Sequence, residues 1–299
     1  MAAGSETSTD CISNPIFEEL RALGFGREPR PFFPRTRDAD IPVWRDATGI
    51  LFLQEVATSN AYYEAEKPES RAHGATVVQT RNGSMLTSAL EDADRRLAQF
   101  GELIAGKRVC DFGCGHGDWI GRAHMAGERF AVELRGHCLD YIAEHYPEVR
   151  TAKSIEAFDD LEVVTLFHVL EHIPAQREIL RQIRSRMRPG GLLVVEVPHA
   201  NDHLIHAGPE AFKSFTFWSE HLVLHTRDSL QALLADAGFA DVSVEPFQRY
   251  GLANHRGWFE EGRPGGHVRH TVADAEDLAY REDLARRWAT DTIIALARA

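Results

Sequence analysis

The sequence predicts an α/β protein with a doubly wound, mainly parallel sheet, and three observations support this fold class. From about residue 85 onward, short apolar runs alternate with segments of helical periodicity, as strands and crossover helices do. The run Leu192–Val197 is rich in valine and lacks regular polar alternation, which is typical of a strand buried on both faces. A glycine-rich turn follows an earlier strand, at the sheet edge where such folds bind ligands.

The first three strands are short apolar runs. Lys107–Gly113 stops at a glycine, and Phe130–Leu134 forms the next strand, with room for one short helix between them. A further run covers Leu161–Leu170. The helix after it should place four apolar side chains on one face: Ile179, Leu180, Ile183 and Met187. We expect this helix to end at Arg188–Gly191, because proline cannot continue it and glycine supplies a cap.

The last part of the chain repeats the alternation. Thr226 is a suitable N-cap for a helix that Gly238 closes, with an apolar face of Leu230, Leu233, Leu234 and Ala237. Strands are expected at Val242–Glu245 and at Asp291–Ala297.

Two regions depart from this rhythm. Residues 1–84 are predicted to form an accessory lobe, with a β-hairpin at Val43–Leu53 that turns at Asp46–Gly49 and a helix from Gln54 to about Glu69. Residues 85–299 form the main domain, in which residues 249–288 are an irregular insertion. Its aromatic content favours a functional role, such as covering a substrate.

Composition narrows the classes of partner. A formal charge of −12 provides no electrostatic footprint for nucleic acid, so a small-molecule substrate is expected. The polar start and the absence of a long apolar run predict a cytoplasmic protein without a membrane segment. The four cysteines form no C-x-x-C pair and are expected to be reduced thiols that hold no metal.

The turn after the first strand carries glycine at positions 113, 115 and 117. A dinucleotide fingerprint needs its third glycine at position 118, which is Asp118, so a nucleotide dehydrogenase is disfavoured. The pattern, with Asp111 before it, resembles motif I of class I S-adenosylmethionine-dependent methyltransferases. Any α/β protein can have a glycine-rich first turn, so motif I alone is not specific.

Later segments strengthen the resemblance. Phe167–Pro174, Met187–Pro198 and Ser219–Phe239 are similar to motifs of the ubiquinone-biosynthesis-like branch, in the same order. The resemblance covers about residues 105–247, and Asp291–Ala297 fits the usual last strand.

This resemblance implies a Rossmann-like sheet of seven strands in the order 3-2-1-4-5-7-6, with the seventh strand antiparallel. It also implies S-adenosylmethionine as cofactor. The implied cofactor contacts are Asp111, Gly113, Cys114, Gly115, Gly117, Glu133, Glu156 and His168. Among these, Glu133 would accept the ribose hydroxyls, Glu156 the adenine amine, and His168 would lie beside the methionine end.

The N-terminal hairpin is similar to the zinc-binding lobe of bacterial sugar methyltransferases, but Arg45–Phe52 lacks the cysteines of that lobe. We therefore predict no metal there. The likeness suggests a substrate that contains a sugar or is nucleotide-activated. A homodimer is a separate expectation. Arginines 27, 30, 35 and 37 could neutralise a phosphate or carboxylate, or simply form a solvated face.

Histidines are the candidate bases, because imidazole titrates near neutrality. We expect His221 first and His199 second to act in catalysis, and His172 to be structural. A metal pair of His221 and His225 would need a helix, which an extended Phe215–Trp218 disfavours. We predict no metal site.

The predicted reaction is methyl transfer to a small-molecule acceptor, with a hydroxyl of a sugar or related polar metabolite as first choice. Bacterial secondary metabolism or polysaccharide biosynthesis would supply such an acceptor. The alternatives are N- or C-methylation of another natural product, or a catalytically silent protein that binds the cofactor.

Overall fold

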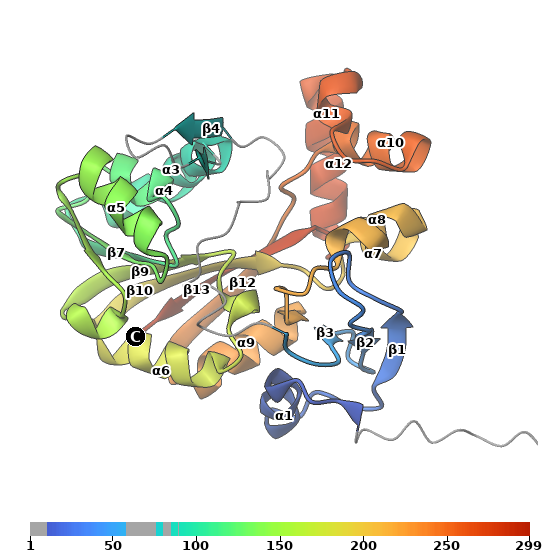
Figure 1. Cartoon of the computed structure of the whole chain (residues 1–299), viewed down its shortest axis with the longest axis horizontal. Helices are drawn as coiled ribbons and strands as arrows, with labels where there is room; N and C mark the ends of the chain where they lie inside the picture. The colour runs from blue at the N-terminus through green and yellow to red at the C-terminus, as the bar shows by residue number, and fades with distance from the viewer. Residues whose placement is uncertain (1–10, 58–75, 80–84, 89) are drawn as a thin grey trace, which may run out of the picture.

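The computed structural model describes residues 11–57, 76–79, 85–88 and 90–299, and its centre is a sheet of seven strands (Figure 1). The strand order is β12-β13-β10-β9-β6-β7-β8. In chain order these are β6 (Arg108–Phe112), β7 (Glu128–Val132), β8 (Val149–Ala152), β9 (Leu161–Phe167), β10 (Met187–Pro198), β12 (Ala240–Phe247) and β13 (Thr292–Arg298). The predicted order 3-2-1-4-5-7-6 is confirmed, and β13 is antiparallel to both neighbours.

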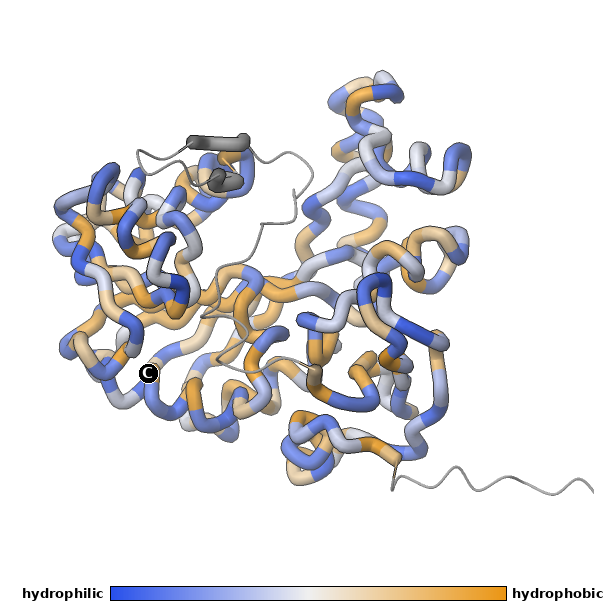
Figure 2. The backbone as a smooth tube through the Cα atoms, viewed as in Figure 1, coloured by the Kyte–Doolittle hydropathy of each residue, from blue (hydrophilic) through white to orange (hydrophobic). Residues whose placement is uncertain are grey.

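Helices cover both faces of the sheet. On one face, α6 (Gln176–Ser185) and α9 (Arg227–Asp236) pack leucine and isoleucine side chains against the strands. On the other lie α3 (Leu90–Ile104), α4 (Asp118–Arg122) and α5 (Gly136–His145). Figure 2 shows the apolar strands running between these two helical layers. The loops at the carboxyl ends of β6, β7 and β9 are thereby held by a core on each side.

The predicted end of the helix before β10 is wrong. α6 ends at Ser185, and Met187 already pairs with Leu161 of β9. The β9–β10 register then shifts between Met187 and Leu192, so the Arg188–Gly191 segment bulges from a strand rather than capping a helix. Met187 stays in the predicted core because its strand position faces the same apolar layer.

Thr226 is the N-cap of α9, as predicted, and forms a capping box with Ser229. We expect Thr226→Ala to lower the free energy of unfolding by about 1 kcal/mol, because the N–H of Ser229 loses its acceptor. Urea titration would measure this, with Asp228→Ala in the same first turn as the control that leaves the cap intact. Equal losses in the two variants would contradict a capping role.

The N-terminal residues form a second, smaller sheet in the order β1-β2-β3-β11. Its elements are β1 (Arg30–Phe33), β2 (Val43–Arg45), β3 (Leu51–Leu53) and β11 (Val223–Leu224), with α1 (Pro15–Ala22) beside them. The predicted hairpin is confirmed, and the buried carboxylate of Asp46 accepts hydrogen bonds from the backbone of Gly26, Thr48 and Ile50. Because β11 pairs with β3, the region around residue 221 is attached to this sheet.

The helix predicted from Gln54 to about Glu69 falls mostly outside the described residues, and residues 54–57 are not helical. A separate two-stranded ribbon is formed by β4 (Thr76–Gln79) and β5 (Met85–Ser88).

The region 249–288 is helical, so the prediction of an irregular insertion is wrong. It contains α10 (Leu252–Glu261), α11 (Gly266–Arg269) and α12 (Asp274–Arg286), which stand beside α7 (His203–Ala207) and α8 (Glu210–Thr216) in Figure 1. α12 buries only Leu284, and α10 buries the polar Asn254 and His255, so neither helix has an apolar stripe. Without such a stripe the sequence shows no helical periodicity here. None of the helices in the described residues has the length and apolar character needed to cross a bilayer.

Candidate functional site

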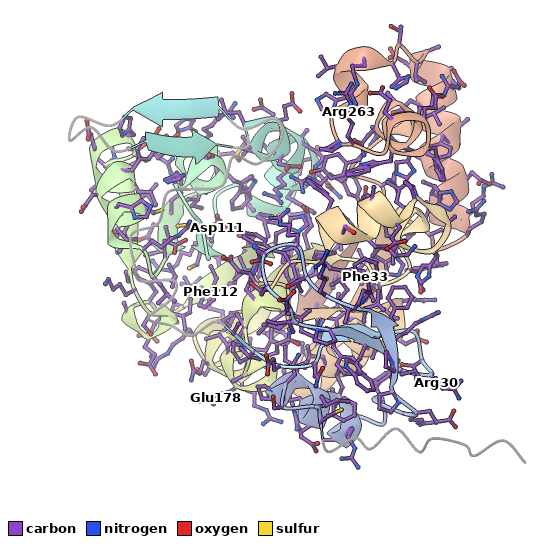
Figure 3. The ribbon with its side chains drawn as sticks, turned by 45° about the vertical axis from the view of Figure 1, so that its right-hand side comes forward. Arg30, Phe33, Asp111, Phe112, Glu178 and Arg263 are labelled. Atoms are coloured by element: carbon purple, nitrogen blue, oxygen red, sulfur yellow. The ribbon has the colours of Figure 1, made fainter. Side chains whose placement is uncertain are left out.

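A cavity of about 630 Å³ opens at the carboxyl ends of β6, β7 and β9. Its wall brings together the glycine turn, the loop after β7, the short helix η2 (Ile155–Ala157) and the turn η3 (Leu170–His172). Phe112 and Glu178, both labelled in Figure 3, are part of this wall. The predicted residues Gly113, Glu133 and His168 also line it.

The glycine turn has no room for side chains at two of its positions. All three glycines have left-handed backbone angles, with φ of 73° at Gly113, 57° at Gly115 and 75° at Gly117. A Cβ added at Gly113 would lie 2.5 Å from Cγ2 of Val169, and one at Gly117 would lie 2.8 Å from Cγ1 of Ile142. The turn therefore presents bare backbone to the cavity, as the pattern predicts.

Glu133 follows the last residue of β7 and holds the glycine turn in place through a hydrogen bond. One carboxylate oxygen accepts a hydrogen bond of 2.9 Å from the N–H of Gly115, and the other accepts from the N–H groups of Leu134 and Arg135. The Arg135 guanidinium also donates to both oxygens. Burial disfavours the charge, but Arg135 and these N–H groups outweigh it and lower the pKa of Glu133. The carboxylate is thus ionised and faces the cavity.

Three other predicted cofactor contacts, Asp111, Cys114 and Glu156, do not line the cavity. Asp111 does not line the cavity and accepts a 2.7 Å hydrogen bond from Thr165, and burial raises its pKa to about 7. Glu156 is exposed on η2, whereas its neighbour Ile155 is buried and lines the cavity. Cys114 is half-buried in the turn. Contact between these three residues and the cofactor stays a prediction.

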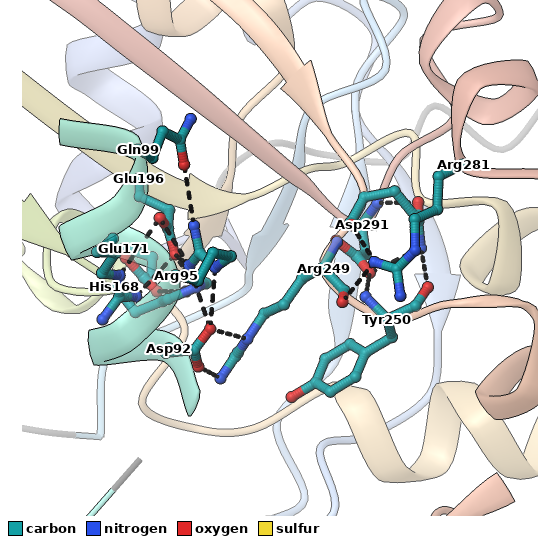
Figure 4. A network of polar contacts seen from close by, with 12 residues as sticks. Asp92, Arg95, Gln99, His168, Glu171, Glu196, Arg249, Tyr250, Arg281 and Asp291 are labelled. Carbon is teal, nitrogen blue, oxygen red and sulfur yellow. Dashed lines mark hydrogen bonds and ion pairs between the residues drawn. The ribbon is translucent and has the colours of Figure 1, made fainter. Parts of the chain in front are cut away.

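A buried polar network lies behind His168 (Figure 4). His168 has a left-handed φ of 55°, and its ring lies between two buried carboxylates, with Nδ1 3.3 Å from Glu171 and Nε2 3.2 Å from Glu196. Glu196 also pairs with Arg95 at 2.8 Å and Arg96 at 2.7 Å, both on α3. Burial opposes the charge of Glu196, but His168 and Arg96 hold its pKa well below the usual range.

No pattern in the sequence assigns a role to these acids and arginines. Glu171 lies within a motif that was recognised, yet its importance comes from burial. Glu196 is the single charge in the apolar run Leu192–Val197, and a lone charge in such a run is a signal of a buried ion pair.

His172 lines the far end of the cavity, and His221 packs against it without lining the cavity itself. Their ring centroids are 4.9 Å apart, and Trp218 packs edge-on against both. His172 lines the cavity and lies next to Glu171. Burial and then the charge of His172 lower the pKa of His221 to about 3, so its ring is neutral near pH 7. His172, which we expected to be structural, lines the cavity and can contact a ligand there.

His199, the second predicted base, is fully buried and does not line the cavity. Its Nδ1 lies 3.0 Å from the carbonyl oxygen of Thr290, and burial lowers its pKa to about 4. His221 and His225 do not face each other, because His225 is buried against Ser229 and Gln176. The segment between His221 and His225 is not helical, as predicted. The prediction of an extended Phe215–Trp218 is wrong in its first half, because Phe215 and Thr216 belong to α8.

Comparisons with known proteins show the family of this chain. Residues 85–244, just over half of the chain, match the family model described as "Methyltransferase domain". A ubiquinone biosynthesis O-methyltransferase of Aeromonas salmonicida is 30% identical over 131 residues, which is 40% of this chain and 52% of that protein. A probable S-adenosylmethionine-dependent methyltransferase of Mycobacterium tuberculosis is 30% identical over 148 residues, which is 46% of this chain and 50% of that protein.

The chain thus spans about half the length of these curated relatives. Among solved structures, an S-adenosylmethionine-dependent methyltransferase from Archaeoglobus fulgidus is 20% identical with a TM-score of 0.49, and the match covers 73% of this chain and 96% of that one. The family match, the strand order and the conformation of the glycine turn all agree with a methyltransferase domain. The chain belongs to the methyltransferase domain family, and its strand order is the one that the resemblance to class I S-adenosylmethionine-dependent methyltransferases implies.

Proposed function

We propose that the protein binds S-adenosylmethionine in the cavity beside the glycine turn and transfers its methyl group to a hydroxyl of a small polar metabolite, with a sugar derivative as first candidate. One observation supports this most strongly. A single cavity joins the glycine turn and Glu133 to His168 and His172, so it offers a nucleoside site at one end and proton-accepting groups at the other.

The residues at the nucleoside end support binding of the cofactor there. The ribose hydroxyls would donate to Glu133 in place of the Arg135 guanidinium, which occupies both oxygens in this structure. The adenine would lie against Ile155, with Glu156 as the predicted acceptor for its amine. The bare backbone at Gly113 and Gly115 would allow the methionine portion to approach closely.

The acceptor end must align a nucleophile with the sulfonium methyl group and remove a proton from a hydroxyl. His221 is our candidate for assisting that proton loss, because its neutral ring lies against His172 at the cavity wall. Neither His221 nor His199 lines the cavity, but His221 packs against His172, which does, and we therefore prefer it to His199.

The charge of −12 supports a small acceptor over nucleic acid. An acceptor oxygen of a ubiquinone-type precursor is a second candidate, suggested by the name of the Aeromonas relative, a ubiquinone biosynthesis O-methyltransferase. Assembly as a homodimer stays a prediction.

The test uses labelled S-adenosylmethionine with a panel of sugar, phenol and amine acceptors. We expect His221→Gln to lower kcat by about 100-fold or more, the usual contribution of proton transfer, while the Kd for S-adenosylhomocysteine changes little. His267→Gln, at an exposed histidine, is the control. Unchanged turnover in His221→Gln would remove this residue from the mechanism, and absence of S-adenosylhomocysteine binding would overturn the proposed function itself.

A further inference from the structure

Three side chains with metal-ligand atoms converge at the acceptor end of the cavity. The carboxylate of Glu171 and the rings of His172 and His221 each place one such atom within 4.8 Å of the other two. Glu171 and His172 come from the η3 turn after β9, whereas His221 comes from the loop before β11. Two segments far apart in the sequence therefore supply the cluster.

The backbone fixes this convergence. The N–H of Leu222, next to His221, donates a 2.8 Å hydrogen bond to the carbonyl oxygen of Glu171. Asn14, buried in the small sheet, donates to the carbonyl oxygen of Leu222. The loop bearing His221 is thus held against the turn bearing Glu171 before any ligand binds, which is the preorganisation that a coordination site needs.

One oxygen of this cluster has no partner. Glu171 is completely buried, and its Oε1 faces His168 at 3.3 Å (Figure 4). Its Oε2 is buried without a hydrogen-bond partner among the described residues. A buried carboxylate oxygen without a hydrogen-bond donor is destabilising, so it calls for a specific partner. A bound cation beside the two imidazoles would be such a partner.

We propose that Glu171, His172 and His221 bind one divalent first-row transition-metal ion, such as Mn²⁺ or Zn²⁺. Two imidazoles and a carboxylate are a ligand set that suits these ions, and three protein ligands leave coordination positions open. Of the three ligands, His172 lines the cavity, so an ion held here would lie beside the space available to an acceptor. This site differs from the sequence expectation of no metal, which considered His221 only with His225.

The inference rests on the proposed function and gives His221 a definite role in it. The acceptor hydroxyl coordinates the cation, which lowers its pKa so that its proton leaves to solvent. The resulting oxygen anion forms a bond to the sulfonium methyl carbon as the bond from that carbon to sulfur breaks, which yields the methyl ether and S-adenosylhomocysteine. In this scheme His221 is a metal ligand and does not accept the proton itself.

The experiment is a titration of the full chain, first freed of metal by a chelator, with Mn²⁺ alone and with Zn²⁺ alone. Calorimetry, and electron paramagnetic resonance for Mn²⁺, would count the bound ions. We expect saturable binding of one ion per chain, weakened at least about 10- to 100-fold in Glu171→Gln, His172→Gln and His221→Gln. Glu178→Gln is the matched control, because Glu178 is an acid of the same cavity outside the cluster.

If Glu171→Gln does not fold, the two histidine variants still decide, since His172 and His221 are partly exposed. Absence of saturable binding, or binding that all three variants retain, would overturn the metal site. S-adenosylhomocysteine binding and methyl transfer in the metal-free protein separate this from the proposed function. Full methyl transfer without a cation would overturn the metal site alone, whereas loss of S-adenosylhomocysteine binding would overturn the proposed function.

Discussion

Replacing Glu196 with glutamine is expected to lower the free energy of unfolding by about 3 kcal/mol, the lower end for breaking a buried ion pair. Glu196 has a completely buried side chain and is the shared counter-ion of Arg95 and Arg96, whose side chains are 22% and 12% exposed. Glutamine keeps the volume and one acceptor oxygen but leaves two largely desolvated cations without their charge partner. Arg95 retains Asp92, which limits the loss.

Asp283→Asn is the matched control for this variant. Asp283 also pairs with two arginines, Arg286 and Arg287, but their side chains are 75% and 52% exposed, so we expect a loss within about 0.5 kcal/mol. Guanidinium unfolding at pH 7 would compare the two variants. A loss in Glu196→Gln no larger than in Asp283→Asn would mean that the network contributes no more than surface charge pairs.

The pH dependence of this difference has a definite sign. The folded pKa of Glu196 lies below its ordinary value of 4.5, so its contribution to stability is fully present above that pH and is lost as the pH falls. The gap between wild type and Glu196→Gln should therefore narrow below about pH 4.5. Unfolding curves at several acidic pH values would show a constant gap if Glu196 were not ionised in the folded state.

The alternating part of the fold could be predicted because each strand there is a short apolar run with a clear boundary. The hairpin at Val43–Leu53 was predictable for a similar reason, since its turn residues carry their own signal, which the Asp46 hydrogen bonds confirm. The α10–α12 helices could not be predicted, because they bury polar side chains and share no apolar face. Periodicity reports burial of apolar groups only.

The candidate site also contains residues that the local sequence predicts and residues that it does not. The glycine turn and Glu133 follow from local pattern, because a backbone conformation and a strand end are local properties. The cluster of Glu171, His172 and His221 depends on the pairing of β11 with β3, which holds the loop of His221 against the turn after β9. No spacing in the sequence encodes that contact, so only the three-dimensional structure could bring these residues together.

Substituting Gly113 with alanine is expected to weaken S-adenosylhomocysteine binding about tenfold or more, a loss of at least about 1.4 kcal/mol in binding free energy. The backbone at Gly113 has a φ of 73°, and an added Cβ would lie 2.5 Å from Cγ2 of Val169, which itself lines the cavity. The new methyl group must displace Val169 or the turn, and either movement disturbs the surface that the methionine portion would contact. Calorimetric titration would measure the change in Kd.

Gly106→Ala separates this clash from backbone strain. Gly106 has a similar φ of 70°, but no atom lies within 4 Å of an added Cβ, so both variants should lose about 1–2 kcal/mol of stability from the left-handed conformation alone. Only Gly113→Ala should lose affinity for S-adenosylhomocysteine. Adding Val169→Ala to Gly113→Ala removes the two methyl groups nearest the new Cβ and should restore part of that affinity. Equal affinities in Gly106→Ala and Gly113→Ala would show that the cofactor does not contact this turn.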